Sequence, residues 1–232
     1  MTELGIPIDP SPALRPQPVL LKGRAVTLRP FDLSSQAEAL YQGTHGPEKE
    51  DLWRYMSEGP FAGQDEFNAA FAKKQSSADP FFFAIVQNAT GVPIGQASYL
   101  RMEPNHRVIE VGNIIFTPAL QRSSGATEAM YLMARHVFED LGYRRYEWKC
   151  NALNQPSRRA ALRLGLDFEG VFRQHMIIKG RNRDTAWFSM LDSEWPRRRA
   201  NLEQWLAPSN FDQTGRQKIS LSLLNGHEVA KH

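Results

Sequence analysis

The sequence predicts a three-layer α/β domain, in which helices cover a central sheet. Segments with the apolar or alternating pattern of strands are interleaved with amphipathic segments of helical period, and no internal repeat is present. A chain of 232 residues suits one domain with short appendages. We divide it into a proline-rich arm at 1–20, a main domain at 21–196, and a helix with a polar tail at 197–232.

The first half of the chain predicts four strands and two helices. Alternation from Arg24 to Arg29 indicates the first strand, after which Asp32 or Ser34 can cap a helix. Phe67 and Phe71, spaced i and i+4, indicate one face of the second helix. The predicted strands are 23–30, 80–87, 93–102 and 106–116, and the predicted helices are 35–42 and 64–75.

The second half predicts a long helix, a strand, a short helix and a hairpin. The helix at 125–141 places Met130, Met133 and Val137 on one apolar face, with Glu128 in its first turn, where a carboxylate suits the helix dipole. A strand at 145–150 and a helix at 156–164 follow, then strands at 169–178 and 184–191 around a turn at 179–183, and a last helix at 192–206. The polar tail from residue 207 is expected to be poorly ordered.

Composition excludes several classes of function. A net charge of +3 suits an anionic cofactor and does not require nucleic acid, because the arginine pairs are dispersed. The single Cys150 permits no internal disulfide and is expected to pack in a strand. Histidines are scattered without metal-ligand spacing, so we predict no metal. Because no apolar run nears a membrane span and no signal peptide is evident, we predict a cytoplasmic protein without membrane contact.

The stretch from Thr117 to Met130, Thr-Pro-Ala-Leu-Gln-Arg-Ser-Ser-Gly-Ala-Thr-Glu-Ala-Met, carries the clearest functional pattern. A strand leads into a loop of small residues and then into a helix. Free N–H groups and the helix dipole at such a junction favour a phosphate. Ordinary capping by Ser and Thr is the alternative. A second stretch, residues 151–170, repeats the order of strand, loop and helix, with Asn154 and Ser157 at the helix start.

Together these stretches resemble the GNAT acyltransferases, in particular the branch that contains the ribosomal-protein N-terminal acetyltransferases. That branch reads roughly Arg-Gly-x-Gly-x-Ala-Thr-Glu-Ala, then Asn-x-x-Ser, then Leu-Gly-Phe-x-x-Glu-Gly. The corresponding residues here are 122–129, Asn154 with Ser157, and 164–170. The resemblance covers about residues 20–196. It implies the GNAT fold, a mixed, mostly antiparallel sheet flanked by helices on both faces, and acetyl-CoA as cosubstrate.

The resemblance also implies a set of cofactor-binding residues. A strand edge would pair with the pantetheine arm, the small-residue loop would hold the pyrophosphate, and the next helix start would bind the arm. Ser124 stands where the family usually has Gly, and Ser tolerates a positive φ poorly, so weak cofactor binding or lost activity is one expectation. The predicted residues are Ile115, Phe116, Gln121, Arg122, Ser123, Ser124, Gly125, Ala126, Thr127, Asn154 and Arg158.

Two residues are candidates for the chemistry of acyl transfer to an amine. Glu110 lies on the strand before the phosphate loop, where the family often has a carboxylate that removes the amine proton. Ser157 matches the family residue that stabilises the departing thiolate. A solvated strand position and a plain helix cap are the respective alternatives. By strand alternation, Asn113 would face away from Glu110 unless a bulge intervenes.

The acceptor is expected to be an amine of low pKa. Deprotonating an α-amine at pH 7 costs about 1.1 kcal/mol, against about 4.6 kcal/mol for a lysine, and the sequence offers one plausible base. The acceptor pocket is predicted between the early helices and the late hairpin, although packing in the core is the alternative for each aromatic residue. Its candidate residues are Trp53, Arg54, Tyr55, Arg173, His175 and Trp187.

The sequence leaves alternatives open for both the acceptor and the activity. Residues 172–187 resemble a subgroup near the microcin-C self-immunity acetyltransferases, which acetylate the α-amine of aminoacyl-nucleotide analogues; protein N-termini and small amines are the other acceptors. A succinyl-CoA or other acyl-CoA transferase, with Arg54 or Arg173 binding the donor carboxylate, is an alternative. A non-catalytic acyl-CoA-binding protein is another. Apolar strand edges and the arm are consistent with a homodimer.

Overall fold

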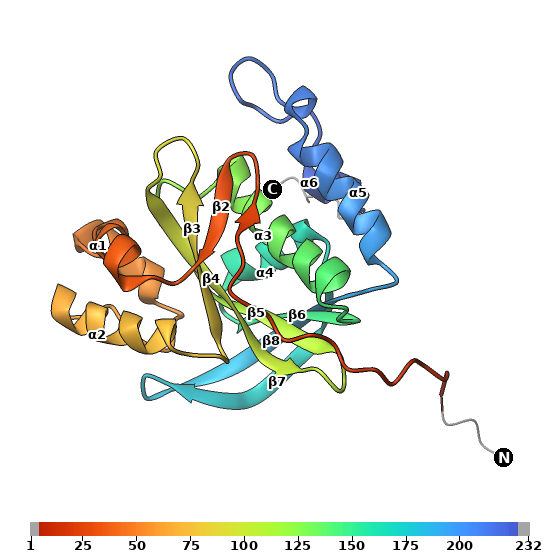
Figure 1. Cartoon of the computed structure of the whole chain (residues 1–232), viewed down its shortest axis with the longest axis horizontal. Helices are drawn as coiled ribbons and strands as arrows, with labels where there is room; N and C mark the ends of the chain where they lie inside the picture. Colours follow the sequence, from red (N-terminus) through yellow and green to blue (C-terminus); the bar gives the residue numbers. More distant parts are fainter. Residues whose placement is uncertain (1–4, 227–232) are drawn as a thin grey trace.

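The computed structural model describes residues 5–226, which form an eight-stranded sheet with helices on both faces (Figure 1). Neighbouring strands are antiparallel except for the parallel pair of β5 and β6, so the predicted fold class is confirmed. Residues 1–4 of the predicted arm and 227–232 of the predicted tail lie outside the described residues. In the order in which they lie side by side, the strands are β1 (Leu21–Lys22), β2 (Val26–Pro30), β3 (Phe81–Gln87), β4 (Pro93–Glu103), β5 (Val108–Phe116), β6 (Arg145–Asn151), β8 (Arg181–Leu191) and β7 (Asp167–Ile178).

Each face of the sheet builds its own hydrophobic core. The larger core lies under α3, α4 and α5, and the second lies under α1 and α2, where the predicted pair Phe67 and Phe71 is buried. Asp32 caps α1 by accepting a hydrogen bond from the Ser34 N–H. The helices are α1 (Leu33–Thr44), α2 (Gln64–Gln75), α3 (Ser124–Arg135), α4 (Gln155–Leu164), α5 (Trp195–Leu206) and α6 (Leu221–Leu224), with shorter turns η1 (Pro47–Trp53), η2 (His136–Asp140) and η3 (Pro208–Asn210).

The first turns of α3 are tied to the start of β2 by a buried carboxylate. Glu128 accepts hydrogen bonds from the backbone N–H groups of Arg24, Ala25 and Val26 at 2.7–2.9 Å. Its predicted interaction with the helix dipole is therefore wrong, because α3 begins at Ser124 and Glu128 lies beyond the first turn. The carboxylate satisfies three N–H donors of the turn before β2 and fixes the position of α3 on the sheet.

A β-bulge in the middle of β5 changes the face of the sheet on which the following side chains lie. The register with β4 shifts between residues 96 and 98, and Asn113 takes a left-handed conformation with φ of 51°. Three side-chain hydrogen bonds hold the bulge: Gln96 Nε2 to the Asn113 carbonyl at 3.1 Å, Asn113 Nδ2 to Ser98 Oγ at 2.9 Å, and Ser98 Oγ to the Gly112 carbonyl at 3.3 Å. The bulge reverses the alternation, so Val111 lies in the larger core whereas Ile115 lies in the second.

Beyond the bulge, β5 and β6 no longer pair. Their parallel register runs only from Val108 opposite Arg145 to Val111 opposite Trp148. After that point β5 pairs with β4 alone and β6 pairs with β8 alone. One side of each strand is therefore left without a neighbour at the end of the sheet where α3 and α4 begin.

The hairpin of β7 and β8 is longer than predicted. Its turn consists of Lys179 and Gly180, with φ of 49° and 71°, rather than residues 179–183. Two successive positive φ values match the right-handed twist of a tight hairpin, which explains the short turn. As a result, Arg183 belongs to β8 and pairs with Met176 of β7.

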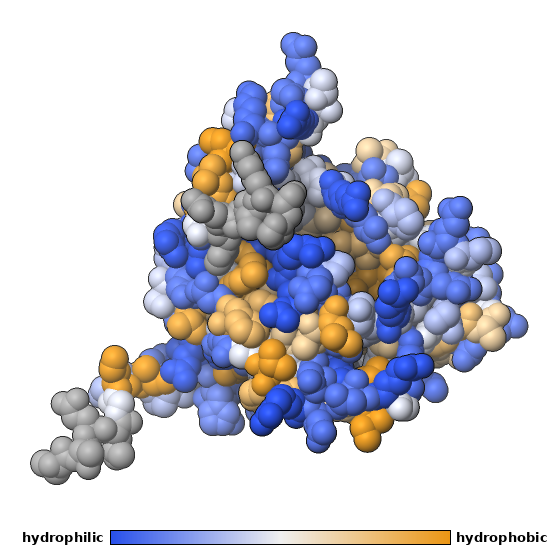
Figure 2. All heavy atoms as spheres, turned by 180° about the vertical axis from the view of Figure 1, so that it is seen from behind, coloured by the Kyte–Doolittle hydropathy of each residue, from blue (hydrophilic) through white to orange (hydrophobic). Residues whose placement is uncertain are grey.

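Residues 207–226 are ordered rather than loose, which corrects the expectation of a poorly ordered tail for that part of the chain. Leu221 is fully buried in the larger core, and Asn210 is buried with its side chain bonded to the Trp205 and Ile219 carbonyls. Arg198 is buried and donates to the Asn225 carbonyl, which ties α5 to the end of α6. The described part of the arm runs along the body, where Arg107 binds Asp9, and its first residues project with exposed apolar side chains (Figures 1 and 2).

Candidate active site

The start of α3 faces the end of the sheet where β5 and β6 diverge. Ser123 caps the helix by accepting a hydrogen bond from the Ala126 N–H. Within residues 5–226, the N–H groups of Ser124 and Gly125 have no acceptor. Two free donors at a helix N-terminus fit a pyrophosphate. The loop at 121–127 therefore has the geometry that the sequence predicted.

Ser124 does not strain this loop. It begins α3 in helical conformation, and the left-handed position is Arg122, with φ of 58°. The expectation that Ser124 needs a positive φ is wrong for that reason. Gly125 serves close packing, because a Cβ there would lie 3.0 Å from a methyl group of Val26 on β2. The substitution of Ser for Gly leaves the free N–H groups in place.

Several of the other predicted cofactor-binding residues already have contacts within the protein. The Ile115 side chain is buried under α1 and α2, so only its backbone is available to a ligand. The Phe116 carbonyl already accepts from Gln121 Nε2 at 3.0 Å. Thr127 accepts from an Arg163 guanidinium nitrogen at 2.9 Å. The sequence analysis missed Arg163, a cation beside the first turn of α3 that lies over the Trp205 ring at 4.6 Å.

At the start of α4, the cap and the candidate hydroxyl are different residues. Asn154 caps the helix by accepting from the Ser157 N–H at 3.1 Å, so the plain-cap alternative for Ser157 is wrong. Ser157 Oγ accepts from the Trp148 indole N–H at 2.9 Å. Because the indole can only donate, the Ser157 proton is directed elsewhere. Arg158 donates to the Ala152 carbonyl at 3.2 Å and lies over the Phe168 ring.

Cys150 lies close to Ser157 on the core side of β6. It is buried, and burial raises the pKa of its thiol, although a hydrogen bond from Ser157 opposes this effect. A thiol that stays protonated is a poor nucleophile. The predicted packing role of Cys150 is therefore confirmed.

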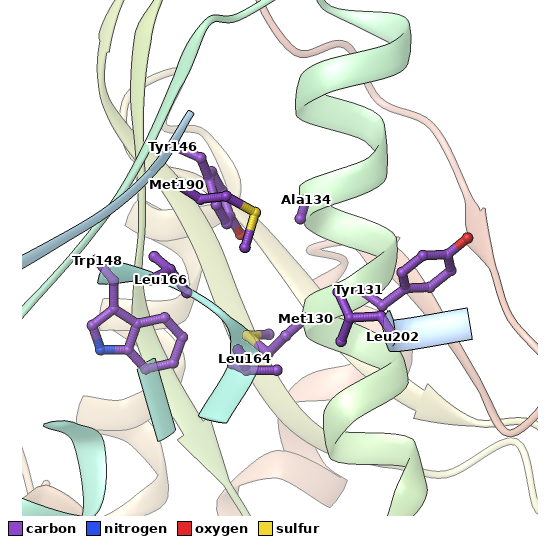
Figure 3. A pocket seen from close by; sticks show the side chains of 9 residues that line it. All are labelled: Met130, Tyr131, Ala134, Tyr146, Trp148, Leu164, Leu166, Met190 and Leu202. Carbon is purple, nitrogen blue, oxygen red and sulfur yellow. The ribbon is translucent and has the colours of Figure 1, made fainter. Parts of the chain in front are cut away.

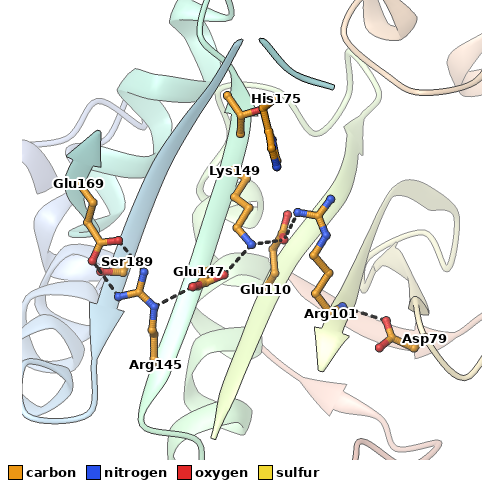
Figure 4. Close-up of polar contacts among 10 residues, drawn as sticks. Asp79, Arg101, Glu110, Arg145, Glu147, Lys149, Glu169, His175 and Ser189 are labelled. Carbon is orange, nitrogen blue, oxygen red and sulfur yellow. Dashed lines mark hydrogen bonds and ion pairs between the residues drawn. The ribbon is translucent and has the colours of Figure 1, made fainter. Parts of the chain in front are cut away.

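A chain of alternating charges crosses the face of the sheet opposite α3 and α4 (Figure 4). Strand alternation places Tyr146, Trp148 and Cys150 in the larger core and turns the charged residues of β6 to this face. Successive contacts measure 2.5–3.2 Å. From β4 to β7 the chain consists of Arg101, Glu110, Lys149, Glu147, Arg145 and Glu169.

Glu110 has one oxygen occupied and one free. Both Arg101 (3.2 Å) and Lys149 (3.0 Å) contact Oε2. Oε1 accepts no hydrogen bond from residues 5–226 and lies beside Gly112, where any Cβ would stand 3.6 Å from it. Burial raises the Glu110 pKa, and the two cations only partly oppose the rise. A carboxylate with a raised pKa and a free oxygen is suited to accept a proton.

Arg101 is aimed at Glu110 by its backbone. It takes a left-handed conformation with φ of 49°, and its N–H donates to Asp79 at 2.9 Å. The Met102 N–H donates to the second oxygen of Asp79 at 3.1 Å. A strained non-glycine position of this kind persists only where surrounding contacts fix it.

Of the predicted acceptor residues on the first side, Tyr55 is the one that reaches the loop between β6 and α4. Trp53 is buried, and its indole N–H donates to the Thr44 carbonyl at 2.8 Å, so it packs the core under α1 and α2. Arg54 is exposed and paired with Asp51. The Tyr55 hydroxyl donates to the Leu153 carbonyl at 3.3 Å and so bridges to the loop between β6 and α4.

The three predicted residues on the hairpin lie on β7 and β8. Trp187 faces the charged chain, with Lys149 Nζ 3.7 Å from its ring centroid. His175 is bonded to Thr185 Oγ1 at 2.9 Å, and Figure 4 shows its ring directed toward Lys149 and Glu110. Arg173 is exposed. Lys179 at the hairpin tip binds the Trp53 and Gly59 carbonyls, so the hairpin contacts the segment at the end of η1.

The molecule has two hollows, one at the surface and one in the larger core. The space-filling view shows a recess with apolar side chains in its depth, on the side where α1 and α2 lie (Figure 2). A separate small gap between α3 and the sheet is a packing defect in the larger core (Figure 3). It is lined by Met130, Tyr131, Ala134, Tyr146, Trp148, Leu164, Leu166, Met190 and Leu202.

The described residues offer neither a metal-binding cluster nor a membrane-spanning helix. No group of three or more His, Cys, Asp or Glu residues within 5–226 is arranged to hold a metal ion. No helix in the same range is long and apolar enough to cross a membrane.

Comparison with known proteins identifies the family. Residues 25–167, more than half of the chain, match the model of the GNAT acetyltransferase domain. The chain belongs to the GNAT acetyltransferase family. It is therefore an acyltransferase, as the two linked motifs predicted.

Individual GNAT proteins extend the likeness to nearly the whole chain. A GCN5-related N-acetyltransferase from Brucella melitensis is 44% identical, with a TM-score of 0.91 over 93% of this chain and 98% of its own. N-acetyltransferase YnaD of Bacillus subtilis is 25% identical over 173 residues, 74% of this chain and 96% of YnaD. RimL, a ribosomal L7/L12 acetyltransferase solved with coenzyme A, shares the fold at 18% identity, with a TM-score of 0.61 over 75% of this chain and 98% of RimL. The likeness to RimL concerns the fold alone.

The charged neighbours of Glu110 are the residues that the sequence analysis missed. The run Arg145-Tyr-Glu-Trp-Lys149 alternates charge with aromatic residues, which indicates a strand with one charged face. That signal was available for Glu147 and Lys149. No such sequence signal marked Arg101 or Arg163, because a bulge and a crossing helix bring them to the site.

The Arg101 side chain provides a test of the electrostatics of the site. Replacing it in an Arg101→Gln variant removes a positive charge that stabilises the Glu110 carboxylate, so the Glu110 pKa should rise further. We expect the acid limb of the profile of kcat/KM against pH to move to higher pH, by roughly 0.5–1 pH unit. Lys73→Gln, which removes the same charge from the exposed face of α2, should leave the limb in place. A limb that stays fixed or moves down in Arg101→Gln contradicts this account of Glu110.

Proposed function

We propose that the protein is an acetyl-CoA-dependent N-acetyltransferase that acetylates a primary amine, in particular an α-amine. The observation that carries the proposal is the free oxygen of Glu110, on the strand that leads to the open helix N-terminus of α3. Direct transfer from a thioester to an amine requires a base near the bound donor, and this strand connects Glu110 to the proposed pyrophosphate site.

The cofactor would lie along the divergence of β5 and β6. The free side of β5 offers backbone groups to the pantetheine amides, and the N–H groups of Ser124 and Gly125 offer donors to the pyrophosphate. Arg163 adds positive charge beside the first turn of α3. Acetyl-CoA, when bound, supplies the activated acetyl group.

Glu110 and Ser157 then have separate roles in the reaction. Glu110 Oε1 takes the proton that the amine loses as it attacks the thioester carbonyl, either directly or through one water. The Ser157 hydroxyl, held by the Trp148 indole, donates a hydrogen bond to the sulfur as negative charge develops there. Attack on the carbonyl forms the amide bond, and the C–S bond breaks to release coenzyme A.

The charges near Glu110 favour an amine of low pKa. Arg101 and Lys149 lie against the carboxylate, and like charges disfavour the protonated ammonium form of an incoming amine. An α-amine with a pKa near 7.8 loses its proton at a smaller cost than a lysine side chain. We therefore favour an aminoacyl conjugate, a small α-amine or a protein N-terminus, and the likeness to microcin-C self-immunity enzymes stays a prediction, as do the homodimer and the cytoplasmic location.

The alternatives are less well supported. The non-catalytic reading depended on strain at Ser124, and Ser124 is helical. Of the two arginines suggested for a succinyl donor, Arg54 is paired with Asp51 and Arg173 is exposed. Neither position favours a carboxylated donor over acetyl-CoA.

A proline at the first position of α3 tests the pyrophosphate site. Ser124→Pro removes one free N–H, yet proline suits this position and Ser123 is already extended, with φ of −95° and ψ of 162°. We expect the Kd for acetyl-CoA, measured by calorimetry, to rise roughly tenfold or more. The matched variant Ser124→Ala, which keeps the N–H, should stay within about threefold of the wild type. Equal affinities in the two variants, with unchanged thermal unfolding, would argue against this phosphate site.

The Ser157 hydroxyl tests the proposed chemistry separately from cofactor binding. In Ser157→Ala we expect kcat for acetyl transfer to fall roughly 100-fold, because the thiolate loses its donor, while the acetyl-CoA Kd changes less than about threefold. Ser193→Ala removes an exposed hydroxyl and serves as the control. An unchanged kcat in Ser157→Ala would mean that Ser157 binds the Trp148 indole but takes no part in catalysis.

A further inference from the structure

Arg183 is a cation on the acceptor side of the site without a counter-ion. It lies on β8, where alternation places it on the same face as Thr185 and Trp187. Its side chain is half-buried, and its Nε is buried with no acceptor among residues 5–226. No carboxylate in the same range lies within ion-pair distance of its guanidinium.

The carboxylates nearby are already engaged. Glu110 is bound by Arg101 and Lys149, and Glu147 is bound by Lys149 and Arg145. The neighbouring Asp184 accepts from the Gln174 N–H and from Asn182. Arg183 is therefore the charge that this network leaves uncompensated.

The strand face that carries Arg183 leads to the reacting centre. The ring centroid of Trp187 on the same face lies 3.7 Å from Lys149 Nζ, and Lys149 contacts Glu110 at 3.0 Å. Burial lowers the Arg183 pKa, and the nearby Cys150 and Glu110 oppose that effect. His175 is fixed by Thr185, two residues along β8 from Arg183. A half-buried cation with a free donor costs folding energy unless a ligand satisfies it.

We propose that Arg183 binds an anionic group, a carboxylate or a phosphate, that the acceptor carries close to its reacting amine. A guanidinium forms paired hydrogen bonds with either anion. The inference rests on the proposed function and narrows its acceptors to amines with a negative charge a few bonds from the nitrogen. Neutral amines lack the group that would compensate Arg183.

The test compares acceptors with and without an anionic group, at saturating acetyl-CoA and high enzyme concentration. Isoasparagine is set against asparaginamide, and O-phosphoserinamide against serinamide, in the wild type, Arg183→Gln and Arg183→Lys. We expect kcat/KM of the wild type to favour the anionic member of at least one pair roughly tenfold or more. Arg183→Gln should abolish that preference, and Arg183→Lys should restore part of it.

Other outcomes overturn the inference. Turnover without an anionic preference, or a preference that survives in Arg183→Gln, removes Arg183 from acceptor recognition. A selective loss of succinyl-CoA turnover in Arg183→Gln, with acceptor preference intact, would assign Arg183 to a donor carboxylate instead. Absence of turnover with every amine would overturn the proposed function as well, so the two failures are distinguishable. Calorimetry with acetyl-CoA should give equal Kd values for Arg183→Gln and the wild type.

Discussion

The divergence of β5 from β6 is the constraint on which the rest of the site depends. Two parallel strands that stayed paired would leave no backbone edge for a ligand. The bulge at Asn113 prevents that pairing, and Gln96 and Ser98 of β4 supply the hydrogen bonds that it would otherwise leave unmade. The same bulge moves Ile115 under α1 and α2, so one irregularity opens the cleft and completes the second core.

The electrostatic design of the site follows from the uncovered half of the sheet. Because no hydrophobic helix lies over the second face of β6 and β8 within residues 5–226, alternating charges fill it. Breaking one buried pair in such a network typically costs about 3–5 kcal/mol, since the remaining charge is left uncompensated. The network therefore holds Glu110 in place by one oxygen and leaves the other for chemistry.

Local sequence signals predicted much of the fold and the open N-terminus of α3. Asp32 caps α1 as expected, and the small-residue loop before α3 has the expected free N–H groups. Asn154, the residue expected to bind the cofactor arm, caps α4. The sequence did not reveal contacts that depend on register. Arg183 was assigned to a turn because nothing local distinguishes a five-residue loop from the two-residue turn at Lys179, and Trp53 was assigned to the acceptor pocket because composition does not separate a core indole from an exposed one. Residues 207–226 are held by Leu221, which is fully buried in the larger core, and by the buried side chain of Asn210, which binds two carbonyl groups.

Hydrogen exchange of backbone amides, measured with and without saturating acetyl-CoA, tests the central claim most directly. We predict that acetyl-CoA slows exchange in peptides covering 112–117 and 122–127, the free side of β5 and the start of α3, and leaves the hairpin turn at 179–180 unchanged. Protection confined to other segments, or micromolar binding without protection of either peptide, would contradict a cofactor site built by the divergence of β5 and β6.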